Sequence, residues 1–192
     1  MASKVALQYG VLTGERVGRP FIAALQKAGF EITSRPESAD IIIGHSGGCF
    51  WLPQAPTKQK LLLINPPFWP GRTVKSRIIR RTLTYFMFWR HGYTLPRWLW
   101  RSGWGIYYGI TELPRHHALG KQSSRYRLEA IIERHTALII RNTADDWLTP
   151  NYKQLLNKHQ GLSFAELPGD HDNCWINPEP YVRALKSFVG KA

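Results

Sequence analysis

The sequence has few of the features that cross-link a chain or carry it through a membrane. Cysteine occurs only twice in 192 residues, as Cys49 and Cys174, which excludes a disulfide framework and predicts two buried thiols in a reducing compartment. No run approaches the roughly 18 consecutive apolar residues of a membrane span. The first residues, MASKVALQYG, lack the charged and then apolar pattern of a signal peptide. These absences predict a cytoplasmic protein.

Acidic residues are also scarce. The chain carries 13 Asp and Glu against 26 Lys and Arg, which gives a formal net charge of +13 and a pI near 10.1. Such a surplus predicts attraction to an anionic partner: nucleic acid, an acidic lipid surface or a negatively charged substrate. The apolar content of 43% and the charged content of 20% are typical of a folded globular protein. A chain of this length fits one domain, residues 1–192.

Short apolar runs alternate with helical patterns along most of the chain. The runs predict six strands, at Val5–Tyr9, Phe30–Ser34, Asp40–Gly44, Leu61–Ile64, Ala137–Ile140 and Leu162–Leu167. Helical spacing predicts helices at Phe21–Ala28, Ser124–His135, Tyr152–His159 and Glu179–Val189. Because strands alternate with helices, we expect an α/β fold with a parallel, doubly wound sheet of about six strands flanked by helices.

Residues at about 67–122 interrupt this alternation. They are rich in Trp, Tyr, Arg and Gly, and no acidic residue lies between Pro66 and Thr111. We interpret them as an insertion above the sheet, with a helix at Val74–Phe88 that has one basic and one apolar face. Interleaved Arg and Trp fit three roles, in order of preference: packing on the sheet around a substrate pocket, contact with a membrane interface, and binding of single-stranded nucleic acid.

The segment Gly44-His45-Ser46-Gly47-Gly48 directly follows a predicted buried strand. A serine on a sharp turn from strand to helix has a strained backbone, and small residues two before and two after it prevent clashes. The turn lifts the hydroxyl clear of the sheet and points the amide of Gly47 at developing negative charge. The segment therefore predicts Ser46 as a nucleophile, with Gly47 as one oxyanion donor.

A serine hydroxyl needs a base, and His171 has the best position for that role. It follows the last predicted strand and precedes the last helix, in a loop at the edge of the sheet where Ser46 is expected. The side chain of His45 is expected to point away from Ser46. The remaining histidines of the second half lack such a setting and are expected at the surface: His116, His117, His135 and His159.

The acid that orients the base is expected after the strand Ala137–Ile140, where two carboxylates are adjacent. Counting from the strand end favours Asp145, whereas counting back from Pro150 favours Asp146. We prefer Asp145 and treat the other carboxylate as a surface or helix-capping residue. A second oxyanion donor is also needed, and the loop after the first strand offers the amide of Val11.

Together these segments resemble the α/β-hydrolase superfamily. DIIIGHSGG is similar to the nucleophile elbow of that family, LIIRNTADDWLTP to its acid loop and ELPGDHDNCW to its histidine loop. The resemblance implies a minimal α/β-hydrolase fold in which the Arg/Trp-rich insertion is a lid. The usual antiparallel N-terminal strands and the helix before the nucleophile strand are missing. Asn142 stands where the family usually has Gly, and Tyr9 where it commonly has His.

The predicted function is that of a serine hydrolase. It would cleave a carboxylic ester or thioester of a small acyl substrate through an acyl-enzyme on Ser46, with no metal or cofactor. Acyl transfer to an acceptor other than water shares the first half of this reaction. The alternative is a non-catalytic protein on the same scaffold that binds an anionic partner through its cationic insertion. That partner would be an acidic lipid surface, with peripheral attachment to the membrane, or nucleic acid, which we consider less favoured.

Overall fold

The computed structural model describes residues 2–10, 13–52, 58–67, 94–123, 127–145 and 162–190. Six strands in these ranges form one sheet in which every recorded pair is parallel, in the order β2-β1-β3-β4-β5-β6. The strands are β1 (Lys4–Gln8), β2 (Glu31–Ile32), β3 (Ile41–His45), β4 (Lys60–Ile64), β5 (Ala137–Asn142) and β6 (Ser163–Leu167). The predicted α/β fold with a parallel, doubly wound sheet of about six strands is confirmed.

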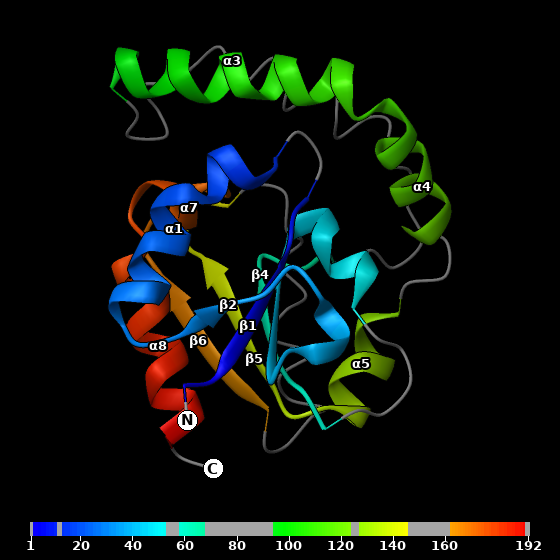
Figure 1. Cartoon of the computed structure of the whole chain (residues 1–192), viewed down its shortest axis with the longest axis vertical. Helices are drawn as coiled ribbons and strands as arrows, with labels where there is room; N and C mark the ends of the chain where they lie inside the picture. The colour runs from blue at the N-terminus through cyan, green and yellow to red at the C-terminus, as the bar shows by residue number, and fades with distance from the viewer. Residues whose placement is uncertain are drawn as a thin grey trace.

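Helices cover both faces of this sheet (Figure 1). One face packs against α1 (Glu15–Lys27), α7 (Asn173–Ile176) and α8 (Glu179–Gly190), and the other against η2 (Ser46–Trp51) and α5 (Leu128–Arg134). Apolar side chains therefore line both sides of the central strands. In β3, Ile41 and Ile43 belong to the first core and Ile42 to the second. Each such buried side chain contributes about 1.5–3 kcal/mol relative to exposure.

The order of the strands reverses between β1 and β3. The chain leaves β1, crosses through α1 to β2 on one side, and then returns past β1 to β3 on the other. A short 3₁₀ helix, η1 (Pro36–Ser38), is the element between β2 and β3. Loops diverge where a strand order reverses in this way, and ligands bind there, at the carboxyl ends of the strands. The loops after β1 and β3 are those in which the oxyanion donors are predicted.

The first helix is longer than predicted. α1 begins at Glu15 and not at Phe21, and it continues through Gly18 and Pro20. Gly18 has a packing role, because a Cβ built there would lie 2.6 Å from Cε1 of Tyr9. The buried face of the helix outweighs the low helix propensity of these two residues.

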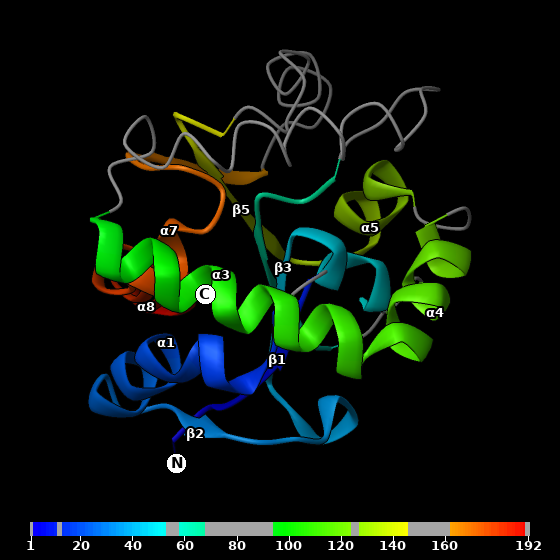
Figure 2. The ribbon, with the colours of Figure 1, turned by 90° about the horizontal axis from the view of Figure 1, so that it is seen from above.

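Residues after Pro67 contain two described helices, α3 (Leu95–Thr111) and α4 (Leu113–Ser123). Figure 1 shows α3 lying across the end of the molecule toward which the strands point, and Figure 2 shows it in front of that end. The helix predicted at Val74–Phe88 lies outside the described residues, as does the helix predicted at Tyr152–His159. The extent of the insertion and its role as a lid stay predictions. No described helix is long and apolar enough to cross a membrane.

Side-chain burial tests three smaller expectations. Cys49 and Cys174 are both fully buried free thiols, as predicted. His117 is exposed, as predicted. His135, however, was expected at the surface and is buried, because it lies at the junction of α5 and β5, which both pack in the core. The side chain of His116 and all of His159 lie outside the described residues.

Candidate active site

Ser46 occupies a strained turn immediately after β3. Its φ of 52° lies in the left-handed region, which residues with a side chain rarely adopt. The glycines two before and two after it provide the space for this turn. A Cβ on Gly44 would lie 3.1 Å from the Cα of Cys49, and one on Gly48 would lie 2.0 Å from the carbonyl oxygen of Gln8. The helix after the turn is a short 3₁₀ helix, η2, whose first residue is Ser46 itself.

The loop after β1 passes beside this turn. A Cβ built on Gly10 would lie 3.2 Å from both the Cβ of Ser46 and the backbone N of Gly47. The Oγ1 of Thr13 donates a 2.8 Å hydrogen bond to the carbonyl of Gly10 and so ties the two ends of the loop together. Val11, the predicted second oxyanion donor, lies outside the described residues.

An arginine of α4 holds the same loop from outside. Arg115 donates from Nη2 to the carbonyl of Tyr9 at 2.7 Å and from Nη1 to that of Thr13 at 3.2 Å. Its Nη1 also pairs with Glu112 at 2.5 Å. α4 is thus attached to the loop in which Val11 is predicted to act.

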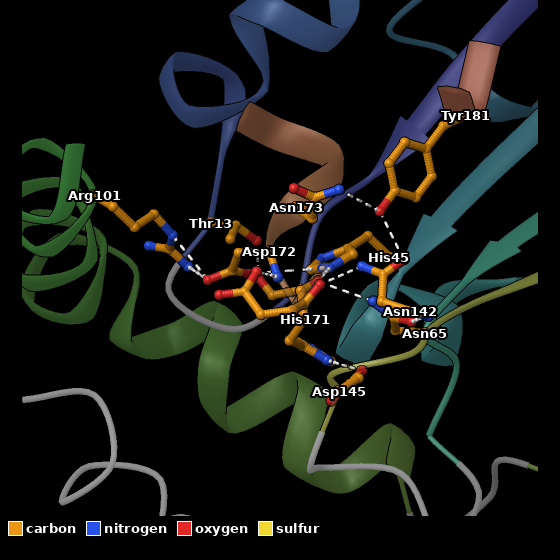
Figure 3. A network of polar contacts seen from close by, with 12 residues as sticks. Thr13, His45, Asn65, Arg101, Asn142, Asp145, His171, Asp172, Asn173 and Tyr181 are labelled. Atoms are coloured by element: carbon orange, nitrogen blue, oxygen red, sulfur yellow. Dashed lines mark hydrogen bonds and ion pairs between the residues drawn. The ribbon is translucent and has the colours of Figure 1, made fainter. Parts of the chain in front are cut away.

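His171 and Asp145 form a close buried pair (Figure 3). Nδ1 of His171 lies 2.6 Å from Oδ2 of Asp145, and neither residue is more than 6% exposed. Asp145 follows β5 and His171 follows β6, so neighbouring parallel strands bring the two loops to the same edge of the sheet. Asp146, the alternative acid, lies outside the described residues.

Two side chains hold the main chain of His171. Nε2 of His45 lies 2.8 Å from the carbonyl oxygen of His171, and Nδ2 of Asn65 donates to the same oxygen at 2.9 Å. The ring of His45 also lies 5.0 Å from that of His171, centroid to centroid. Since His45 directly precedes Ser46, the elbow and the histidine loop are joined by a direct contact.

Asn142 joins the acid loop to the histidine loop. Its backbone N–H donates to Oδ1 of Asn65 at 2.8 Å, and its side-chain amide donates to the carbonyl of Asp170. Tyr181 of α8 donates in turn to Oδ1 of Asn142 at 2.6 Å. Asn142 is fully buried, so it satisfies several buried polar groups at once.

Sequence reasoning missed Asn65 and the roles of Asn142. The available signal was their position at the edge of the sheet where Ser46 is predicted, because Asn65 directly follows β4 and Asn142 is the last residue of β5. Asn65 also has a φ of 47°, a conformation that asparagine tolerates better than most residues.

A buried ion pair attaches α3 to the histidine loop. Nη2 of Arg101 lies 3.0 Å from Oδ2 of Asp172, and its Nε donates to the same oxygen at 3.1 Å. In Figure 3 the arginine reaches this carboxylate from α3. Arg101 is only 5% exposed and Asp172 only 2%. No sequence signal singles out Arg101 among the arginines of this segment.

One group of side chains in the described part of the chain has the spacing of metal ligands. Ligand atoms of His45, His171 and Asp172 lie within 4.8 Å of one another. Asp172, however, is already paired with Arg101, whose charge would repel a cation, and Nδ1 of His171 already pairs with Asp145. We therefore assign no metal ligand here.

Burial keeps His45 uncharged. Removal from water, followed by the neighbouring His171, lowers the pKa of His45 from 6.5 to about 3. Its neutral Nε2–H then donates to the carbonyl of His171. Its Nδ1 is buried and has no hydrogen-bond partner among the described residues, so a second proton would bury an unpaired N–H group.

This lowered pKa predicts acid sensitivity. Between pH 6.5 and about 3 the unfolded chain binds a proton at His45 that the folded chain does not. The contribution of neutral His45 to stability is therefore full above pH 6.5 and declines as the pH falls, by up to about 1.4 kcal/mol per pH unit. Urea denaturation of wild type and His45→Gln across this range should show their free energies of unfolding converge at low pH. A parallel shift of the two curves would contradict this, and His117→Gln on the exposed surface is the matched control.

Comparisons with known proteins identify solved structures that share this fold. A scan against protein-family models finds no match, and a search of curated proteins finds none. Solved structures match over nearly the whole chain. An enol-lactonase from Burkholderia xenovorans LB400 is 15% identical, with 99% of this chain and 92% of that chain covered and a TM-score of 0.68. A serine hydrolase involved in carbazole degradation is 14% identical, with coverage of 100% and 92% and a TM-score of 0.67. A hydrolase from Pseudomonas aeruginosa PA01 is 18% identical, with coverage of 98% and 90% and a TM-score of 0.66. The chain therefore has the fold of the α/β-hydrolase superfamily.

Proposed function

We propose that this protein is a serine hydrolase that cleaves a carboxylic ester or thioester. One observation carries the proposal: the buried His171–Asp145 pair is joined, through the contact between His45 and the carbonyl of His171, to the strained turn that bears Ser46. A histidine held by a buried carboxylate beside a serine on such a turn is the arrangement that activates a hydroxyl.

The chemistry follows from these positions. His171 accepts the proton of the Ser46 hydroxyl as its oxygen attacks the acyl carbon, and then gives that proton to the leaving alcohol or thiol. Asp145 keeps the imidazole oriented and stabilises its protonated form. Water, activated by His171, then attacks the acyl-enzyme, and the products are the free acid and the regenerated serine. No metal or cofactor takes part in these steps.

The developing oxyanion needs donors beside Ser46. The amide of Gly47 is one, because it directly follows the nucleophile. The amide of Val11 is the second in our proposal. Its support is the close approach of Gly10 to Ser46 and Gly47, together with the bonds of Thr13 and Arg115 that hold both ends of the loop.

The printed names of some similar structures are compatible with an ester substrate. One similar structure is an enol-lactonase, which by its name acts on a cyclic ester, and another is a serine hydrolase.

Labelling with a fluorophosphonate probe tests the proposal. The probe reacts with an activated serine, so wild type should be labelled, and Ser46→Ala and His171→Ala should not. Circular dichroism and thermal melting would establish that both variants remain folded. Ser187→Ala, at an exposed position of α8, is the matched control and should be labelled like wild type. Labelling that persists in Ser46→Ala, or a folded wild type that is not labelled, would refute the assignment.

A further inference from the structure

The outward face of α3 is apolar. Eight large apolar side chains are exposed in the described part of the chain, and six of them belong to this one helix: Leu95, Leu99, Trp100, Ile106, Tyr107 and Ile110. Leu113, the first residue of α4, continues the row and is 63% exposed. An exposed apolar surface gathered in one place marks an interaction site, whereas scattered apolar residues do not.

α3 is apolar on its outward side as well as on the side where Tyr108 packs in the core. At 100° per residue, Leu95, Leu99, Ile106 and Ile110 fall within one narrow stripe of the helix. Arg101 lies on the opposite side, is 5% exposed and pairs with Asp172. Arg101 thus faces inward while the stripe of Leu95, Leu99, Ile106 and Ile110 is exposed, and Figures 1 and 2 show no other labelled element covering the helix on that side.

The charge around this face selects the kind of partner. The helix itself, LPRWLWRSGWGIYYGIT, carries two arginines and no acidic residue. Arg16 adds an exposed cation at the helix, with its guanidinium 4.7 Å from the centre of the Trp104 ring. Like charge disfavours a second copy on this face, since each copy carries a formal charge of +13. An anionic partner with an apolar interior matches both the exposed apolar face of α3 and the positive charge of the chain.

We propose that the exposed face of α3 docks on an anionic lipid bilayer. Leucine and isoleucine side chains enter the boundary between headgroups and acyl chains, Trp100 and Tyr107 lie at headgroup depth, and the net positive charge of the chain attracts acidic lipids. The opposite side of the same helix contacts Asp172, the residue after His171. Docking therefore brings the bilayer to within roughly one helix diameter, about 10 Å, of the histidine loop.

Vesicle binding tests this independently of catalysis. Proteins carrying Ser46→Ala would be sedimented with vesicles of phosphatidylcholine alone and with vesicles that also contain phosphatidylserine. The Ser46→Ala protein should bind the anionic vesicles, and less so at high salt because salt screens the attraction. Adding Leu99→Gln, Ile106→Gln and Ile110→Gln should reduce binding by about tenfold or more. Gln keeps the helix propensity of these positions high.

The matched control keeps the same three positions apolar, with Leu99→Met, Ile106→Leu and Ile110→Leu, and should bind like the parent. Absence of binding by the parent, or equal binding by the Gln variant, would overturn the proposal. So would sedimentation equilibrium in which the parent is a dimer and the Gln variant a monomer, because a second copy would then cover the face. In an otherwise wild-type background the Gln variant should be labelled normally by the fluorophosphonate probe, which separates a failure of docking from a failure of the proposed activity.

Discussion

Asp145→Asn is expected to lower kcat for an ester substrate by about four orders of magnitude, with little change in KM. The carboxylate is buried, and its Oδ2 lies 2.6 Å from Nδ1 of His171. Asparagine has the same shape but no negative charge, so it neither stabilises the imidazolium nor enforces the tautomer in which Nε2 is free to accept a proton. The measurement is steady-state hydrolysis of a chromogenic ester such as p-nitrophenyl acetate, with melting temperatures for both proteins.

The neighbouring carboxylate provides the control. Asp146→Asn removes the same charge one residue further along the chain, and we expect its kcat to stay close to that of wild type. A large loss in Asp146→Asn with near-normal turnover in Asp145→Asn would reverse the assignment and make Asp146 the acid. Equal, small losses in both variants would contradict a triad altogether.

Gly48→Ala should cost the protein about 3 kcal/mol or more of its free energy of unfolding. The added Cβ would lie 2.0 Å from the carbonyl oxygen of Gln8 and 2.9 Å from the carbonyl carbon of Tyr9. Both are backbone atoms at the end of β1, so relief requires the turn to move away from the central strand. Such a loss is a large part of the roughly 5–15 kcal/mol that stabilises a typical domain. Urea denaturation measures it.

Gly103→Ala is the matched control for this substitution. A Cβ at Gly103 would meet nothing within 4 Å, and alanine is the better helix former, so we expect a gain of roughly 0.5–1 kcal/mol. If Gly48→Ala were as stable as Gly103→Ala, the close approach of the elbow to β1 would be wrong. A Gly48→Ala protein that fails to fold while Gly103→Ala folds would agree with the prediction.

The strands were predictable because their signal is local. Each is a short apolar run that ends in glycine, proline or a polar residue, and the bounds observed for β4 and β6 differ from those expected by one residue. Helices were less predictable where packing outweighs propensity. α1 continues through Gly18 and Pro20 because its far side is buried, a fact that no window of sequence contains.

For the candidate site, the sequence singled out residues by type and by place after a strand. It predicted that Ser46, His171 and one of two aspartates would meet at one edge of a parallel sheet. In the structure, Nδ1 of His171 contacts Oδ2 of Asp145, whereas Asp146 lies outside the described residues. The contacts that hold these residues in place could not be predicted from the sequence. Asn65, for example, contacts a residue 106 positions away, and nothing near it in the sequence indicates that partner.

By itself, therefore, the sequence determined the alternation of strands and helices, the parallel sheet and the edge at which the candidate site residues lie, because these follow from apolar periodicity and turn chemistry along the chain. Only the tertiary structure decided which side chains hold them there. In the folded protein His45 is buried against His171, and Arg101 points inward and pairs with Asp172. Leu99 and Ile106 are exposed on the outward side of the same helix as Arg101. The physical reason is that burial and charge pairing depend on segments distant in sequence, whose approach is fixed only when the sheet and its helices pack together.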